Sequence, residues 1–198
     1  MSKNTQRVEL LYNSPIDLAV LAARTCWDSM DKSDNNGPRD MALLKSILAK
    51  NHESVIEHIV YTFKIEGFSR AVLQELARHR IASPSVRSTR YTLKKLSKLT
   101  DEELSEQFVS TDPDLDQLEF EYVKNLIEIV KRKGLVPDRF KHKIPESLKF
   151  EAVWTINARS LRNFLSLRMS KAALWEIREL AQAIKKELPK EHIEIMFN

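Results

Sequence analysis

The chain has 198 residues, enough to bury one sizeable core, so we expect a single domain over residues 1–198. Its hydrophobic content of 42%, charged content of 30% and net charge of +4 are ordinary for a globular protein. No apolar run is long enough to span a bilayer, and residues 1–10 lack the apolar region of a signal peptide. We therefore expect a cytoplasmic protein with no membrane partner. The single cysteine, Cys26, excludes internal disulfides and multi-cysteine metal sites.

The N-terminal third predicts two strands with two helices between them. Residues 7–12 read as a strand, and Ser14 is expected to cap a helix that runs to about Trp27. On this helix the predicted inward residues are Ile16, Val20, Leu21 and Ala23, and Cys26 is expected to be a small buried residue. A polar loop over 28–38 and a helix over 39–50 follow. Residues 58–66 alternate apolar and polar side chains, which predicts a half-buried strand.

The middle of the chain is expected to change from strand to helix at Gly67. A helix over 69–80, capped by Ser69, would place Arg70, Gln74 and Arg78 on one polar face. Residues 81–88 read as a loop and 90–92 as extended chain. The acidic stretch 97–114 shows no period and is expected to be a surface excursion.

The C-terminal part predicts a helix over 115–133 that stops at Gly134, then a strand over 148–157. Helices follow at 158–168 and 171–187, the second ending at Pro189. This mixture of elements predicts an α+β fold in which helices flank a central, mostly antiparallel sheet.

Glycine is scarce, which limits how the chain could hold a phosphate. Only Gly37, Gly67 and Gly134 are present, each isolated, so neither a P-loop nor a G-x-G-x-x-G turn exists. A bound nucleotide must therefore be held by side chains. Arginine suits this task because its planar fork matches two phosphate oxygens.

The segment 78–91 gathers basic and hydroxyl side chains with no acidic residue among them. Its basic residues are Arg78, His79, Arg80, Arg87 and Arg90, and its hydroxyls include Ser83, Ser85, Ser88 and Thr89. Two plain interpretations are a helix C-terminus that favours cations and a solvated basic face. The alternative is a site for a compact anion, which would relieve the repulsion among these cations.

Two further segments carry polar side chains at regular spacing. Residues 52–58 read H-E-S-V-I-E-H. The two metalloprotease motifs would need a histidine at 56 or at 54, where the chain has Ile56 and Ser54, so we expect no metal site. We expect these polar residues to form one wall of a ligand pocket instead. Residues 157–168 predict a helix whose inward residues are Leu161, Phe164, Leu165 and Leu167. Arg159 and Asn163 lie one turn apart on another side of it and could donate to one ligand.

These three segments together resemble the flavin-dependent thymidylate synthases. The family signature is R-H-R followed after about seven residues by Ser, matched here by residues 78–80 and Ser88. The H-E-x-x-x-E-H segment (52–58) and N-A-R-S-L-x-N-F-L-x-L-R (157–168) stand in family order. The resemblance covers about residues 15–95 and 145–185.

The resemblance implies a homotetramer that binds FAD where subunits meet, takes dUMP as substrate, and uses NADPH and 5,10-methylenetetrahydrofolate. Carried over by position, the cofactor-binding residues would be His52, Ser54, Glu57, Arg78, His79, Arg80, Ile81, Ser85, Asn157, Arg159, Asn163 and Leu167. The substrate-binding residues would be Gln74, Glu75, Arg78, Val86, Arg87, Ser88, Thr89, Arg90, Lys141 and Arg168. Arg168 matches the family arginine thought to bind uracil and favour its ionisation.

The chain departs from the family pattern at four places. Ser85, Val86 and Arg87 replace Asn, Glu and Leu in the R-H-R loop, and Glu75 replaces a Gln. Lys141 stands for a phosphate-facing Arg, and Ala172 for a His often found at the flavin. These departures bear on how dUMP and flavin are held and leave the implied reaction unchanged.

The motifs contain no cysteine, so activation of uracil at C5 is expected to be electrostatic. A fixed cation at Arg168 would stabilise the charge that develops on the base. Two alternatives remain open at this point. One is a nucleic-acid-binding module, which would need aromatic residues between the basic ones where the chain offers only Tyr91. The other is a related flavoprotein that has lost methylation.

Overall fold

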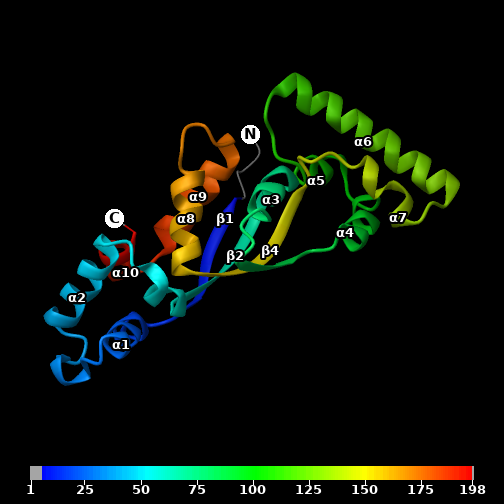
Figure 1. Cartoon of the computed structure of the whole chain (residues 1–198). Helices are drawn as coiled ribbons and strands as arrows, with labels where there is room; N and C mark the ends of the chain where they lie inside the picture. Colours follow the sequence, from blue (N-terminus) through cyan, green and yellow to red (C-terminus); the bar gives the residue numbers. More distant parts are fainter. Residues whose placement is uncertain (1–5, 198) are drawn as a thin grey trace. The chain divides into compact units, whose positions relative to one another are not determined.

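The computed structural model describes residues 6–197, apart from the side chains of residues 91 and 92. Four strands form one antiparallel sheet in the order β1–β2–β4–β3, of which β1, β2 and β4 are labelled in Figure 1. The strands are β1 Arg7–Asn13, β2 Val60–Ser69, β3 Ala82–Val86 and β4 Lys149–Asn157. The predicted α+β class and antiparallel sheet are confirmed.

Alternating burial along the two middle strands shows why these residues form a sheet. On β2, Tyr61, Phe63 and Ile65 are fully buried, as the period of two predicted. On β4 the residues Phe150, Ala152, Trp154 and Ile156 are buried in the same way. Each large apolar side chain taken out of water contributes roughly 1.5–3 kcal/mol. The predicted strands 7–12, 58–66 and 148–157 are therefore confirmed within a few residues.

The chain divides into two compact units, each of which includes parts of the strands. The second unit comprises Val8–Lys64, Ala77–Pro84 and Val153–Asn198. Its α1 packs against α2 and the 3-10 helix η2, while α8 packs against η2 and α9 (Figure 1). Its helical elements are α1 Asp17–Cys26, η1 Met30–Lys32, α2 Pro38–Ala49, η2 Glu53–His58, α8 Ala158–Arg168, α9 Trp175–Glu187 and α10 Lys190–Met196.

The first unit comprises Met1–Arg7, Ile65–Leu76 and Ser85–Ala152. Its helical elements are α3 Arg70–Leu76, α4 Thr89–Leu96, α5 Asp101–Ser105, α6 Pro113–Lys133, α7 Pro137–Phe140 and η3 Lys141–Lys143. They bury a core that includes Leu93, Leu96, Val123 and Phe140. The long helix α6 begins after the Asp112 cap and ends at Gly134, whose φ of 58° is left-handed, so the predicted stop is confirmed.

Several predictions for the second unit are wrong. Ser14 does not cap α1, because its Oγ accepts a hydrogen bond from the Val60 N–H at 3.1 Å. This bond joins β2 to the segment between β1 and α1. Leu21 is 49% exposed, and Cys26 is exposed at the last position of α1. The last predicted helix starts at Trp175 rather than 171, and Pro189 is followed by α10, which the sequence reading missed.

Four predictions in the middle of the chain are also wrong. Strand β2 continues through Gly67, which adopts a φ of 80°, and α3 ends at Leu76, so Arg78 lies outside the helix. The expected loop contains β3, an edge strand that tolerates Pro84. Residues 90–92 are helical, because Leu93 and Leu96 on the same helix enter the core.

The acidic stretch 97–114 is more structured than a surface excursion. Thr100 and Glu103 form a capping box that starts α5, and Leu104, Phe108 and Val109 are buried. An isolated bridge also joins Phe108 to Leu148. Among the residues described, no helix is long and apolar enough to cross a membrane.

Candidate functional site

Helix α8 packs its apolar inner face into the core and exposes polar side chains on its other side. Asn157 caps the helix, accepting a hydrogen bond from the Ser160 N–H at 2.8 Å. Leu161 and Phe164 on its inner face are fully buried. The opposite face leaves Asn163 exposed, as predicted for a helix with this spacing. Leu167, predicted to face inward, is 53% exposed and therefore lies at the surface with the polar residues.

Ion pairs join α8 to η2, which brings two of the three predicted segments together. Arg159 donates to Glu57 at 2.5 Å and lies 3.8 Å from Glu53. Glu53 also pairs with Arg162 at 3.4 Å. Glu53 was not among the predicted site residues, although its place in the 52–58 motif could have drawn attention to it. Because Arg159 and Glu57 are both about half exposed, their pair contributes little stability and can be opened by a ligand.

Arg168 and His79 form the second junction within this unit. The Arg168 Nε donates to His79 Nε2 at 3.0 Å. Because arginine only donates, this nitrogen of His79 must be an acceptor, so the ring is neutral with its proton on Nδ1. The edge of His79 also contacts the buried ring of Phe164, with centroids 4.9 Å apart. Phe164 thus supports His79, which in turn orients the Arg168 guanidinium.

Several predicted cofactor residues of this unit are exposed to solvent. Arg78 and Arg80 are exposed, and Ile81 is 71% exposed. Within residues 6–197 neither arginine forms an ion pair. His52 and Ser54, at the start of η2, are exposed as well. Exposed guanidinium groups beside an exposed apolar side chain offer both anionic and apolar contacts to a ligand.

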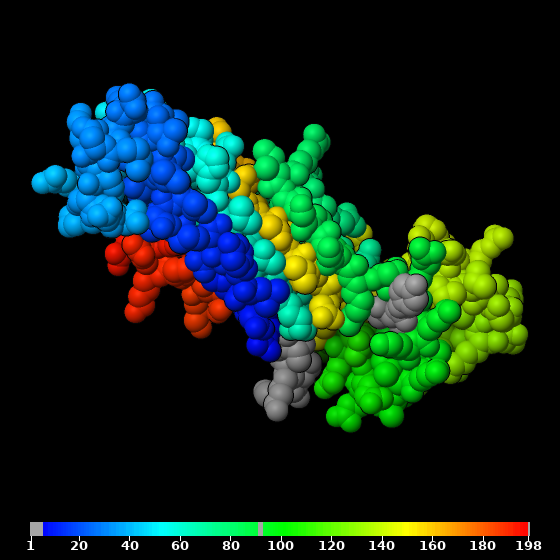
Figure 2. Space-filling view, turned by 90° about the horizontal axis from the view of Figure 1, so that it is seen from below, coloured from blue at the N-terminus to red at the C-terminus, as the bar shows by residue number. Residues whose placement is uncertain are grey.

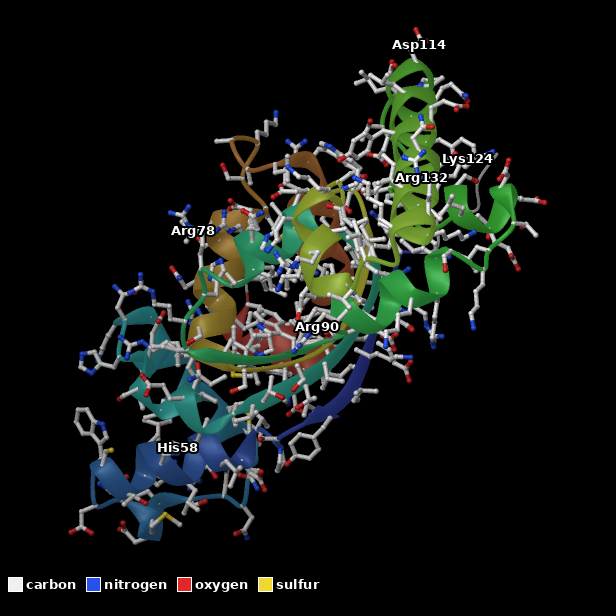
Figure 3. The ribbon with its side chains drawn as sticks, turned by 90° about the vertical axis from the view of Figure 1, so that its right-hand side faces the viewer. His58, Arg78, Arg90, Asp114, Lys124 and Arg132 are labelled. Atoms are coloured by element: carbon white, nitrogen blue, oxygen red, sulfur yellow. The ribbon has the colours of Figure 1, made fainter. Side chains whose placement is uncertain are left out.

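The first unit holds most of the predicted substrate residues. Ser88 occupies the N-cap position of α4, so Thr89 and Arg90 lie in the first turn of that helix. Figure 3 labels Arg78, which precedes β3, and Arg90 in α4. Helix α4 contacts both α7 and η3, the 3-10 helix that begins at Lys141. A helix N-terminus with nearby basic side chains is favourable for an anion.

Two arginines of the basic segment have acidic partners from distant parts of the chain. Arg87 lies 3.4 Å from Glu151 on β4, and Arg90 lies 3.7 Å from Asp138 on α7. The segment itself contains no acidic residue, but these two arginines have acidic partners elsewhere in the chain, which the sequence does not reveal. All four groups are exposed, so each pair is worth at most about 1 kcal/mol.

The remaining predicted substrate residues are also placed in the first unit. Gln74 donates through its side chain to Glu146, and Glu75 is half-buried on α3. Ser85 is exposed and Val86 half-buried at the end of β3. Among the residues described, no three His, Cys, Asp or Glu side chains are placed to hold a metal ion. The assigned roles of these residues stay predictions.

The fold is an α+β fold with one antiparallel sheet, and the candidate site offers exposed arginine and serine side chains and no glycine-rich phosphate loop. The family model described as thymidylate synthase complementing protein matches residues 9–192. The flavin-dependent thymidylate synthase of Wolinella succinogenes is 48% identical over 193 residues, covering 93% of this chain and 94% of that protein. That of Campylobacter jejuni is 45% identical over 94% of this chain and 93% of that protein.

Solved structures agree with the sequence relatives. The crystal structure of thymidylate synthase X from Helicobacter pylori with FAD and dUMP superposes with a TM-score of 0.89. It is 38% identical and covers 96% of this chain and 97% of that one. This chain belongs to the flavin-dependent thymidylate synthase family.

Proposed function

We propose that this chain binds FAD and dUMP through the side chains described above, with NADPH as reductant and 5,10-methylenetetrahydrofolate as carbon donor. Its family makes it an enzyme that methylates dUMP to dTMP. Arg168 is the residue on which the proposal depends most. The observation that carries it is the 3.0 Å hydrogen bond by which Arg168 donates to a neutral His79.

The residues of the second unit fit a flavin dinucleotide. Arg78 and Arg80 can donate to its pyrophosphate, a role that the missing glycine loops leave to side chains. The exposed Ile81 and Leu167 give apolar contacts for a planar ring. The polar residues of this unit proposed to complete the site are His52, Ser54, Glu57, His79, Asn157, Arg159 and Asn163. Ser85, which belongs to the first unit, is also proposed as a cofactor residue. When bound and reduced, FAD supplies the hydride.

The residues of the first unit fit a nucleoside monophosphate. Ser88, Thr89 and Arg90 place a hydroxyl group, backbone N–H groups and a guanidinium at the start of α4. Arg90 can leave Asp138 for a phosphate at low cost because both groups are exposed. The other proposed substrate residues of this unit are Gln74, Glu75, Val86, Arg87 and Lys141, and Arg78 is proposed from the second unit.

Activation of the uracil ring falls to Arg168. As a permanent cation it stabilises negative charge that develops on the base, and it cannot act as a general base at neutral pH. His79 keeps it oriented, so little reorganisation is needed when the charge develops. Cys26, exposed at the end of α1, lies outside all three motifs, which supports activation without a thiolate.

The proposal also covers the oligomeric state of the protein and its location in the cell. We infer a homotetramer in the cytoplasm, with active sites where subunits meet and no nucleic-acid partner. The resemblance in sequence motifs supports the tetramer, and the modest net charge of +4 argues against a nucleic-acid surface. Sedimentation of the purified protein at micromolar concentration tests the assembly.

Release of tritium from dUMP labelled at C5 tests the reaction. The complete mixture with FAD, NADPH and 5,10-methylenetetrahydrofolate is expected to release tritium and form dTMP. Omitting FAD or the folate should stop dTMP formation. Bound flavin without tritium release from the complete mixture would overturn the proposed chemistry.

A further inference from the structure

A large cavity lies in the first unit, outside the residues proposed to bind FAD and dUMP. It is formed by α4, the C-terminal part of α6, the turn that follows and α7, and its volume is about 680 Å³. In the space-filling view of Figure 2, the green part of the chain adjoins the lime-coloured part at the surface. A volume of this size lies in the range of small-molecule sites.

The cavity lining combines an apolar floor with a basic rim. Apolar side chains of the floor include Leu93, Ile127, Val130, Val136 and Phe140. The rim carries Lys94, Lys95, Lys98 and Lys131, and all four are exposed. Of the described residues that line the cavity, none is acidic.

The lysines have no counter-charge within the part of the chain that the structure describes. None of the four forms an ion pair there, in contrast to Lys124, which pairs with Asp101 at 2.7 Å. Lys94 and Lys131 lie in last turns of helices, which suits the helix dipole. The dipole explains single cations at each helix end, but it does not explain why two helix ends meet around an open apolar space. Like charges that gather there repel one another until an anion joins them.

We propose that this cavity binds a small aromatic carboxylate, with its ring on the apolar floor and its carboxylate among the rim lysines. Burial of one or two fused rings supplies the main attraction, because aromatic side chains and rings bury large apolar areas. The lysines set the preference for an anion and the orientation of the ring. An aromatic ligand fits better than a flexible chain, since a rigid ring loses less conformational freedom on binding.

Calorimetric titration with 2-naphthoate tests the assignment on the full-length protein. We expect saturable binding that weakens as salt is raised, because the rim charges are exposed. Lys94→Gln with Lys98→Gln should weaken binding about fivefold, the sum of two exposed charge contacts. Val136→Asp, at a lining residue that is 59% exposed and therefore tolerant of change, should weaken it by at least as much.

The matched control is Lys185→Gln with Lys186→Gln on α9, which should leave the affinity unchanged. Circular dichroism of each variant checks that it is folded. Absence of 2-naphthoate binding would overturn the proposal, as would equal affinity in all variants. Binding of decanoate in preference to 2-naphthoate would overturn the assignment to an aromatic ligand.

Discussion

Replacing His79 by Leu tests whether Arg168 is oriented by its neighbour. The substitution removes the acceptor of the 3.0 Å hydrogen bond from Arg168 Nε and keeps an apolar side chain against Phe164. Hydrogen bonds to charged groups are worth about 1.5–3 kcal/mol. If that energy is expressed in the transition state, kcat falls roughly 10- to 150-fold at about 1.4 kcal/mol per tenfold.

The assay is initial-rate tritium release at saturating dUMP, with flavin occupancy measured separately from the absorption of the protein-bound cofactor. His79→Gln is the matched control, because its side-chain oxygen can still accept a hydrogen bond. It should keep a larger part of the wild-type kcat than His79→Leu. If His79→Leu binds FAD fully and turns over at the wild-type rate, His79 does not orient Arg168.

Three further predictions concern stability. Burial raises the pKa of Asp40, but hydrogen bonds from Ser33 and Arg24 lower it to about 2, so its stabilising contribution is complete above pH 3.8 and is lost as the pH falls toward 2. Asp40→Ala should cost about 3–5 kcal/mol in urea unfolding at pH 7, because it leaves buried Arg24 unpaired, and a cost below 1 kcal/mol would contradict this. Burial lowers the pKa of His192, whose Nδ1 lies 2.7 Å from Tyr61 Oη, so thermal stability should fall as the pH drops below about 6.5. His192→Gln should flatten that decline, and an unchanged pH profile would refute it. Gly134→Ala should cost about 1 kcal/mol at a φ of 58°, whereas Gly134→Asn should cost less, and equal costs would contradict this reason.

Local signals in the sequence located much of the fold. The alternation in residues 58–66 and 148–157 placed two strands, and helix 158–168 was predicted with the bounds that the structure shows. Each of these segments has one buried face, so its apolar residues recur with the period of a strand or a helix and can be recognised in the sequence. Gly134 likewise marked the end of α6, because the left-handed conformation there favours glycine.

Predictions failed where tertiary contacts decide the local structure. The sequence predicted that the Ser14 hydroxyl caps a helix. In the structure this hydroxyl instead accepts a hydrogen bond from the N–H of Val60, 46 residues away. Residues 90–92 joined a helix because Leu93 and Leu96 are buried in the core of the first unit. The T-x-x-E capping box at Thr100 was present in the sequence and was overlooked.

For the candidate site as well, some features were predictable from local sequence and others were not. The 52–58 and 157–168 motifs were both predicted to line a flavin site, which stays a prediction, and the structure shows ion pairs between them. The acidic partners of Arg87 and Arg90 come from residues about 50 or more positions along the chain, so no local pattern could reveal them. Glu53 was not predicted because its partners Arg159 and Arg162 lie more than 100 positions away in the sequence.

The most direct test of the central claim compares Arg168→Ala with Cys26→Ala in the tritium-release assay. The account predicts that Arg168→Ala retains bound flavin and loses turnover, because the fixed cation that activates uracil is gone. Cys26→Ala, changed at an exposed position at the end of α1, should keep full activity. Loss of turnover in folded, flavin-bound Cys26→Ala, or its retention in Arg168→Ala, would contradict activation by Arg168.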